Sequence, residues 1–223
     1  VSRKDEIELI RDAKENGIDC TCEVTPHHLF MGDDTLLPDS LRTVKPPLNT
    51  SEDREALWEN MDIIDCFATD HAPHLKEEKQ TCGCPGFTGL ETMLPLLLNA
   101  VNAGKLTIDD IVEKCYHNPK RILRLNPNYG ENSYIEINLD REYEISDSKL
   151  KTKAKWTPFD GVKVKGSLER FVFNGKCVFN NGLNENITRL GQNVNVFKTS
   201  IVSVNNENEK YVRSHSVSSG NNL

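Results

Sequence analysis

The stretch Ile63-Ile64-Asp65-Cys66-Phe67-Ala68-Thr69-Asp70 is a short apolar run that ends in a carboxylate. Its length and composition are typical of a buried strand in a parallel sheet. Residues 18–24 predict a second strand, with Glu23 at its carboxyl end. Pro and His follow each of these two acidic residues within five positions. The repeated arrangement indicates two strands of one sheet whose carboxyl ends carry titratable side chains.

Helical patterns alternate with these strands. Apolar residues recur at helical spacing, and capping residues mark several of the expected helix starts. Helices are expected after Ser2 with Asp5, after Asn49-Thr50-Ser51, after Thr88 with Glu91, over residues 107–116, and from Asn118-Pro119. Alternating strands and helices predict an α/β fold with a parallel sheet, either open or closed into a barrel. In both arrangements, functional residues collect at the carboxyl ends of the strands.

The pattern changes after about Leu125. Residues 134–139 and 162–164 alternate with period two, and residues 171–179 form two strand-like runs around Asn174-Gly175, a strong hairpin signal. From about Gly191 the chain is rich in Asn and Ser, which is typical of a flexible linker. We therefore expect three parts: 1–125 as an α/β barrel segment, 126–190 as a small β-rich subdomain, and 191–223 as a linker or tail.

Composition limits the possible functions. The 223 residues include 27 Lys and Arg, 34 Asp and Glu, and 37% hydrophobic residues, with a net charge of −7. This composition is globular, and the negative charge argues against sequence-independent binding to nucleic acid. No apolar run approaches the length that spans a bilayer. The first residue is Val1 and no signal peptide follows it, so we expect the chain to begin inside a larger protein.

The seven cysteines indicate a reducing compartment. Their odd number does not fit a secreted disulfide framework, so a cytoplasmic location is expected. Cys20 with Cys22 and Cys82 with Cys84 have C-x-C spacing, whereas zinc knuckles use C-x2-C. Residues 75–84 are polar and charged, and we expect a surface loop whose two cysteines lie in an exposed turn and bind no metal.

The two strand ends carry the candidate chemistry. Glu23 is expected either to bind a metal or to form a structural ion pair, because an unpaired carboxylate is costly to bury. The adjacent His27 and His28 are expected to diverge on an extended segment, so that at most one faces the site. Asp70 lies close in sequence to two imidazoles and can ligate a metal or act as a base. A hydrolytic zinc needs about three protein ligands, and the sequence has no H-x-H pair, so the site looks incomplete.

Several motifs of this sequence together are specific. They are Cys22-Glu23-Val24-Thr25-Pro26-His27-His28-Leu29, Val44-Lys45-Pro46-Pro47-Leu48, Ala56-Leu57-Trp58, Ile64-Asp65-Cys66-Phe67-Ala68-Thr69-Asp70-His71-Ala72-Pro73-His74, Pro85-Gly86-Phe87, Gly89-Leu90-Glu91-Thr92, His117-Asn118-Pro119 and Trp156-Thr157-Pro158-Phe159. These motifs resemble dihydroorotase, a member of the amidohydrolase superfamily, and the resemblance covers roughly residues 1–190. The similarity is greatest to the dihydroorotase domain of the animal multifunctional pyrimidine-synthesis proteins, which also carry carbamoyl-phosphate synthetase and aspartate transcarbamoylase.

The resemblance implies a metal-dependent (β/α)8 TIM-like barrel with a small β domain. It implies two zinc ions bridged by a carbamylated lysine and a hydroxide, with Asp70 as the ligand that ends the last strand. Asp70 would take the proton from the hydroxide and deliver it to the leaving nitrogen. Glu23 matches a carboxylate that can hold an additional zinc, and His74 and Pro85 match positions that contact substrate. Lys45 replaces an arginine that usually binds the substrate carboxylate, which keeps the charge but loses the bidentate fork.

The implied reaction is the reversible cyclisation of N-carbamoyl-L-aspartate to (S)-dihydroorotate in pyrimidine biosynthesis. The implied partners are the carbamoyl-phosphate synthetase and aspartate transcarbamoylase domains, with a homo-oligomer as the assembly. The remaining metal ligands of the family are an H-x-H pair, the lysine and two histidines, and we expect them upstream of Val1. About three barrel strands cannot close a barrel or assemble a binuclear site, so the chain alone is expected to be inactive.

Two alternatives to dihydroorotase stay open. The first is an enzyme that resembles hydantoinase or dihydropyrimidinase and acts on other cyclic amides, although Asp70-His71-Ala72-Pro73-His74 favours dihydroorotase. The second is a non-catalytic protein of amidohydrolase fold that serves in assembly. The retention of Asp70 and His74 argues against such a loss of function.

Overall fold

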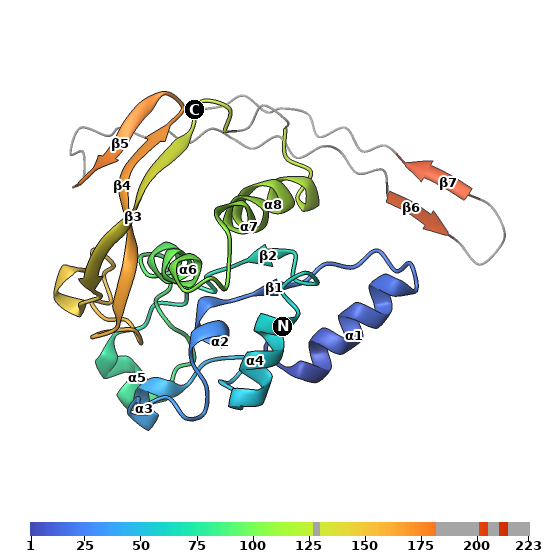
Figure 1. The fold of residues 1–223 in the computed structure, drawn as a ribbon. Helices are drawn as coiled ribbons and strands as arrows, with labels where there is room; N and C mark the ends of the chain where they lie inside the picture. Colours follow the sequence, from blue (N-terminus) through green and yellow to red (C-terminus); the bar gives the residue numbers. More distant parts are fainter. Residues whose placement is uncertain (127–129, 182–200, 205–209, 214–223) are drawn as a thin grey trace, which may run out of the picture.

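The computed structural model describes residues 1–126 and 130–181, and the backbone of residues 201–204 and 210–213 (Figure 1). The helices are α1 Lys4–Glu15, α2 Pro26–Phe30, α3 Asp39–Arg42, α4 Ser51–Glu59, α5 Lys76–Cys82, α6 Met93–Asn102, α7 Ile108–Val112, the π-helix η1 Glu113–His117, α8 Asn118–Ile122 and the 3-10 helix η2 Asp147–Lys149. The strands are β1 Glu23–Val24, β2 Cys66–Phe67, β3 Tyr134–Glu144, β4 Lys163–Phe173, β5 Lys176–Asn180, β6 Ile201–Val204 and β7 Lys210–Arg213.

The strands β1 and β2 form the parallel sheet that the two apolar runs predict. Glu23 lies opposite Cys66, and Val24 opposite Phe67. Both strands are shorter than expected, because within the described residues each has a ladder partner on one side only. Glu23 therefore begins β1, whereas we expected it at the carboxyl end of a longer strand. Asp70 is the third residue after Phe67, the last residue of β2. The parallel pairing agrees with the barrel expectation.

Helices α1, α4, α6 and α7 surround this small sheet and bury its apolar side chains. Figure 1 shows α6 between the β1–β2 pair and the long strands β3 and β4. The main core is built from residues of both strands and all four helices, and includes Ile7, Val24, Leu57, Phe67, Leu97 and Ile111. No helix within the described ranges is long and apolar enough to cross a membrane.

The helix starts agree with expectation in part. Thr50 caps α4 and Thr107 caps α7, each with an aspartate three residues later. At α1, Glu6 accepts the amide of Ser2, at 2.7 Å, so Asp5 is not the capping acid. The short helix α8 begins at Asn118 with Pro119 in its first turn, as expected, but it continues directly from α7 and η1, so Asn118 is not its cap.

The expected capping box of Thr88 and Glu91 is wrong. The Glu91 carboxylate accepts the backbone amides of Lys151, at 2.9 Å, and Thr152, at 2.7 Å, and so holds a distant loop. The Thr88 hydroxyl donates to the carbonyl of Trp156. Both side chains bind residues about 60 positions away, which local spacing cannot indicate.

Residues 75–84 are a helix followed by a tight turn, and the expected surface loop is wrong. The Glu78 carboxylate accepts the Leu75 amide at 2.8 Å, and Gly83 ends α5 in a left-handed conformation, with φ of 63°. This turn brings the Cα atoms of Cys82 and Cys84 within 5.3 Å, and their sulfurs form a disulfide. Cys82 lies on the surface, as expected of an exposed turn, but the pair is oxidised in the structure.

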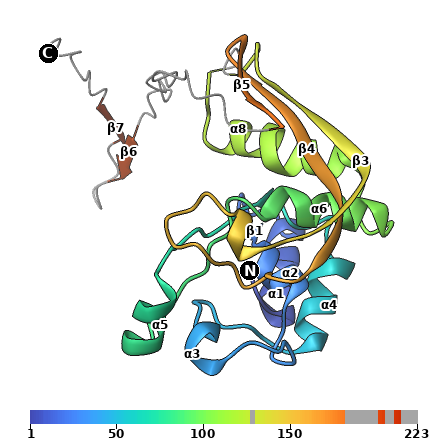
Figure 2. The ribbon, with the colours of Figure 1, turned by 90° about the vertical axis from the view of Figure 1, so that its left-hand side faces the viewer.

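The β-rich part is an antiparallel sheet in the order β3-β4-β5. Asn174 and Gly175 form the β4–β5 turn with positive φ values of 48° and 76°, as the hairpin signal predicts. Figure 2 shows β3 and β4 running past α6. The Asn102 side chain of α6 donates to the carbonyls of Leu139 and Lys165, so this sheet is joined to the helical part.

Only part of the expected tail is described. Strands β6 and β7 pair antiparallel, which a plain linker does not predict. The other residues of the expected tail, and residues 182–190 of the expected β-rich part, lie outside the described residues.

Gly166 of β4 lies close to Leu98 of α6. It has a φ of +118°, and a Cβ there would lie 2.5 Å from Cβ of Leu98. We expect Gly166→Ala to destabilise the chain by about 3 kcal/mol, through overpacking and backbone strain. Gly161→Ala is the control, because Gly161 also has positive φ but a Cβ there meets nothing within 4 Å. Urea unfolding of both variants measures the difference, and equal losses would contradict the packing argument.

Candidate active site

Asp70 lies just beyond β2 and is exposed. Its φ is +45°, a left-handed conformation that non-glycine residues adopt rarely. Backbone bonds on both sides maintain it: the Ala68 amide donates to Val24, and the Ala72 amide donates to Phe87. A backbone strained in this way, and bearing an unburied carboxylate at a strand end, is a feature that clusters at functional sites. The structure therefore supports the choice of Asp70 as a candidate.

His71 is held by the chain that follows α5. Its Nδ1 accepts the backbone amides of Gly89, at 3.1 Å, and Leu90, at 3.4 Å. The neutral ring therefore carries its proton on Nε2. His71 also forms a parallel bridge with Phe87. The segment after Asp70 is thus fixed on residues 87–90.

His27 and His28 are both buried, and the expectation that they diverge on an extended segment is wrong. Thr25 caps α2 and Pro26 occupies its first turn, so the pair lies on a helix. The ring centroids are 4.4 Å apart. The Thr25-Pro26 pair is the sequence signal that could have predicted this helix.

The two imidazoles have different surroundings. His28 Nε2 donates to the Pro46 carbonyl, at 3.2 Å, and its Nδ1 bonds the Thr25 hydroxyl, at 2.7 Å. Burial lowers the pKa of His28, while Asp70 is among the nearby groups that raise it. Among the residues that the structure describes, His27 Nε2 is buried without a hydrogen-bond partner. Burial, with His28 beside it, lowers the pKa of His27 to about 3.

The buried His27 makes the chain sensitive to acid. The unfolded chain takes up a proton near the ordinary histidine pKa, whereas folded His27 does so only near 3. The contribution of neutral His27 to the free energy of unfolding is fully present at pH values above the ordinary histidine pKa. It falls as the pH decreases, by about 2 kcal/mol at pH 5. We expect His27→Leu to flatten the dependence of unfolding free energy on pH between 7 and 5. His117→Leu, at an exposed histidine, is the control and keeps the wild-type slope.

Lys45 and Pro85 are exposed and lie on two segments that touch. The Gly86 amide donates to the carbonyl of Thr43, at 3.0 Å. A Cβ at Gly86 would lie 2.5 Å from Cβ of Ala72, so this segment also approaches the one that carries Asp70. The structure thus brings the segments of Lys45, Asp70 and Pro85 together.

His74 is half-buried, and a residue 82 positions further along the chain holds its backbone carbonyl. The indole N–H of Trp156 donates to the His74 carbonyl at 2.7 Å. Trp156 is 1% exposed and packs edge-on against Phe87. His74 therefore belongs to the same group of segments.

Glu23 lies apart from this group. The register places Glu23 beside Cys66, four residues before Asp70. Its carboxylate is exposed, and within the described residues it forms no ion pair. Its backbone carbonyl accepts the amino group of Val1 at 2.7 Å.

Asp70 and Glu23 are the two carboxylates that are expected to bind metal. Within them, no three His, Cys, Asp or Glu side chains gather closely enough to hold a metal ion. Asp70 and Glu23 have the oxygen donors that zinc accepts, and both are exposed and available as individual ligands. The described residues by themselves therefore do not assemble a metal site, and the two carboxylates fit zinc only as individual ligands.

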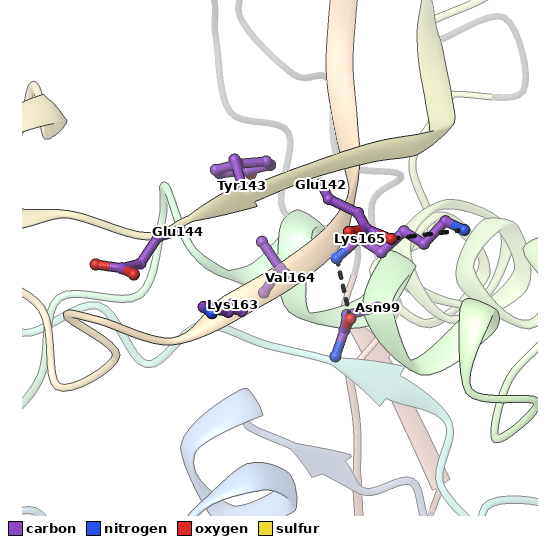
Figure 3. Close-up of a pocket in the computed structure, with 7 residues that line it drawn as sticks. All are labelled: Asn99, Glu142, Tyr143, Glu144, Lys163, Val164 and Lys165. Carbon is purple, nitrogen blue, oxygen red and sulfur yellow. Dashed lines mark hydrogen bonds and ion pairs between the residues drawn. The ribbon is translucent and has the colours of Figure 1, made fainter.

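Two surface cavities of the described residues lie away from the candidate site residues. One of about 440 Å³, shown in Figure 3, lies between α6 and the β3–β4 pair, where the amide of Lys165 donates to Asn99 Oδ1. Another of about 510 Å³ lies between α2, α4 and α6. None of Glu23, Lys45, Asp70, His74 and Pro85 lines either cavity. Lys45, Asp70 and Pro85 are instead exposed on the surface of the described residues.

Comparisons with known proteins identify relatives. No protein-family model matches the sequence. The multifunctional protein CAD of Squalus acanthias is 51% identical over 185 residues, which are 82% of this chain and 8% of that protein. The dihydroorotase of Pyrococcus furiosus is 43% identical over 160 residues, which are 70% of this chain and 38% of that enzyme.

Two solved structures are also similar. An L-hydantoinase from Arthrobacter aurescens superimposes with a TM-score of 0.74 at 30% identity, over 82% of this chain and 44% of that one. The inactive dihydroorotase-like domain of a CAD-like protein from Chaetomium thermophilum gives 0.68 at 31% identity, over 84% and 52%. The expected fold, part of an amidohydrolase barrel with a β-rich addition, is confirmed. The chain belongs to the dihydroorotase family and spans about two fifths of the length of its single-function members.

Proposed function

We propose that this chain is the C-terminal part of a dihydroorotase domain. The proposed reaction is the reversible cyclisation of N-carbamoyl-L-aspartate to (S)-dihydroorotate in pyrimidine biosynthesis, in the full-length protein. The observation that carries the proposal is the convergence of the segments of Lys45, Asp70 and Pro85 at one edge of the sheet. The 43% identity to a dihydroorotase supports it.

Each candidate residue has a chemical role in this proposal. Asp70 takes the proton from the attacking water and returns it to the ring nitrogen as the amide bond breaks. Lys45 pairs with the substrate carboxylate, and His74 and Pro85 bound the ring. Asp70 and Glu23 would hold zinc together with residues from the rest of the domain. Bound zinc supplies Lewis-acid chemistry, which activates water and polarises the amide carbonyl.

The organisation of the whole protein is also part of the proposal. Residues 1–125 complete a barrel, residues 126–190 belong to its β-rich subdomain, and residues 191–223 lead to a neighbouring domain. The similarity to CAD supports fusion with other enzymes of the same pathway. A homo-oligomer and a cytoplasmic location stay predictions.

Two other functions are favoured by specific relatives. The L-hydantoinase neighbour favours hydrolysis of other cyclic amides. The inactive dihydroorotase-like domain favours a role in assembly without catalysis. The experiment that separates the three is hydrolysis by the full-length protein of dihydroorotate, hydantoin and dihydrouracil, with zinc supplied. Dihydroorotate is expected as the preferred substrate. Preference for hydantoin or dihydrouracil would assign a hydantoinase, and no hydrolysis of any would assign the scaffold.

A further inference from the structure

Lys79 is a buried lysine whose ammonium group binds backbone carbonyls. It lies on α5, and its side chain is 0% exposed. Within the described residues its ammonium forms no ion pair. The Nζ atom donates to three backbone carbonyls: Thr43 at 2.7 Å, Cys84 at 2.9 Å and Gly86 at 2.9 Å. All three ammonium protons are therefore used, which compensates for the loss of water.

The aromatic surroundings of Lys79 complete its enclosure. Nζ lies 5.2 Å from the ring centre of Phe87 and 5.8 Å from that of Trp156, close enough for cation–π attraction. Trp156 is the residue that fixes the His74 carbonyl. Lys79 thus contacts the side chain that holds one candidate substrate residue.

The carbonyl partners of Lys79 lie beside the other candidate substrate residues. Thr43 is two residues before Lys45, and Cys84 and Gly86 flank Pro85. The Thr43 carbonyl also accepts the Gly86 amide, so Lys79 closes a junction between two chain segments. Removing Nζ would leave these carbonyls with fewer donors and free the two segments to separate.

We propose that Lys79 is a positioning residue, which holds residues 43–46 and 84–87 together as the substrate-binding edge through its three carbonyl hydrogen bonds. The identity of the substrate in this proposal rests on the proposed function. The junction between the two segments rests on the geometry alone. It predicts that substrate binding changes more than the chemical step, because Lys79 binds the segments of Lys45 and Pro85 directly, whereas Asp70 is linked to residues 84–87 through the Ala72–Phe87 backbone bond.

Lys114 provides a matched control. It is also buried, at 7% exposed, and its Nζ donates to the carbonyls of Met61, at 2.9 Å, and Ile64, at 2.7 Å. These carbonyls precede β2, at the end opposite Asp70. Lys114→Met removes a buried ammonium group and its hydrogen bonds to backbone carbonyls, as Lys79→Met does. It leaves the contacts of the candidate site unchanged.

The test compares Lys79→Met and Lys114→Met in the full-length protein, with zinc supplied. We expect Lys79→Met to raise KM for dihydroorotate at least about tenfold, with kcat changed less than about threefold. Lys114→Met is expected to keep KM within about twofold of wild type, even where its melting temperature falls as far as that of Lys79→Met. A Lys79→Met KM within twofold of wild type, or an equal rise in KM for both variants, would overturn the proposal. Where Lys79→Met does not fold, the smaller change Lys79→Gln decides by the same criterion.

A second readout separates this proposal from the proposed function. Hydrogen exchange of the Gly86 amide reports the junction directly and needs no substrate. Faster exchange in Lys79→Met, and not in Lys114→Met, supports the positioning role even where the wild-type protein hydrolyses no dihydroorotate. Unchanged exchange at Gly86 would overturn it, whatever the activity of the wild type.

Discussion

Asp70→Asn in the full-length protein is expected to lower the rate of dihydroorotate hydrolysis by about 10³-fold or more. Asparagine has nearly the same shape as aspartate, but it cannot accept a proton from water at neutral pH. The Asp70 side chain is exposed, and the adjacent backbone bonds that hold its segment come from Ala68 and Ala72. The fold should therefore persist, and the loss should appear in kcat.

Asp62→Asn is the control for this substitution. Asp62 lies before β2, is 66% exposed, and is 3.6 Å from Arg11 in a surface ion pair. Such pairs contribute about 1 kcal/mol or less, so activity should stay near wild type. Steady-state kinetics and zinc content are measured for both variants. Near-normal turnover by Asp70→Asn would refute its role in proton transfer.

Lys45→Met is expected to raise KM for dihydroorotate by about 30-fold, because one charge-assisted contact to a carboxylate is lost. Lys45 is exposed on the segment that Thr43 joins to Gly86, so the fold does not depend on its charge. Lys45→Arg should keep KM near wild type or lower it, since guanidinium binds a carboxylate with two bonds. Lys105→Met, at an exposed lysine over Trp58, is the control. An unchanged KM in Lys45→Met would remove Lys45 from the site.

Local sequence patterns predicted the elements that carry the site. The apolar runs before Asp70 and around Glu23 predicted two parallel strands, and Asn174-Gly175 predicted the hairpin. These features depend on residues that are neighbours in sequence. The lengths of β1 and β2 were overestimated, because a strand extends only as far as its pairing with a partner strand.

Contacts between distant residues were not predictable in this way. Lys79 looks like a surface lysine in a charged segment, yet its carbonyl partner Thr43 lies 36 residues away. Glu91 follows the capping pattern but binds a loop about 60 residues further on. The helix that buries His27 and His28 could have been predicted from Thr25-Pro26, but the edge-on contact of His27 with Phe87 could not, because the two residues are distant in sequence.

The central proposal is that this chain supplies Asp70 and Glu23 to a dihydroorotase centre whose remaining ligands lie outside residues 1–223. The most direct test measures dihydroorotate hydrolysis by the full-length protein and by residues 1–223 alone, both with added zinc. We predict zinc-dependent hydrolysis by the full-length protein and none by the chain alone. Measurable hydrolysis by the chain alone, or a full-length protein that stays inactive with zinc, would contradict the claim.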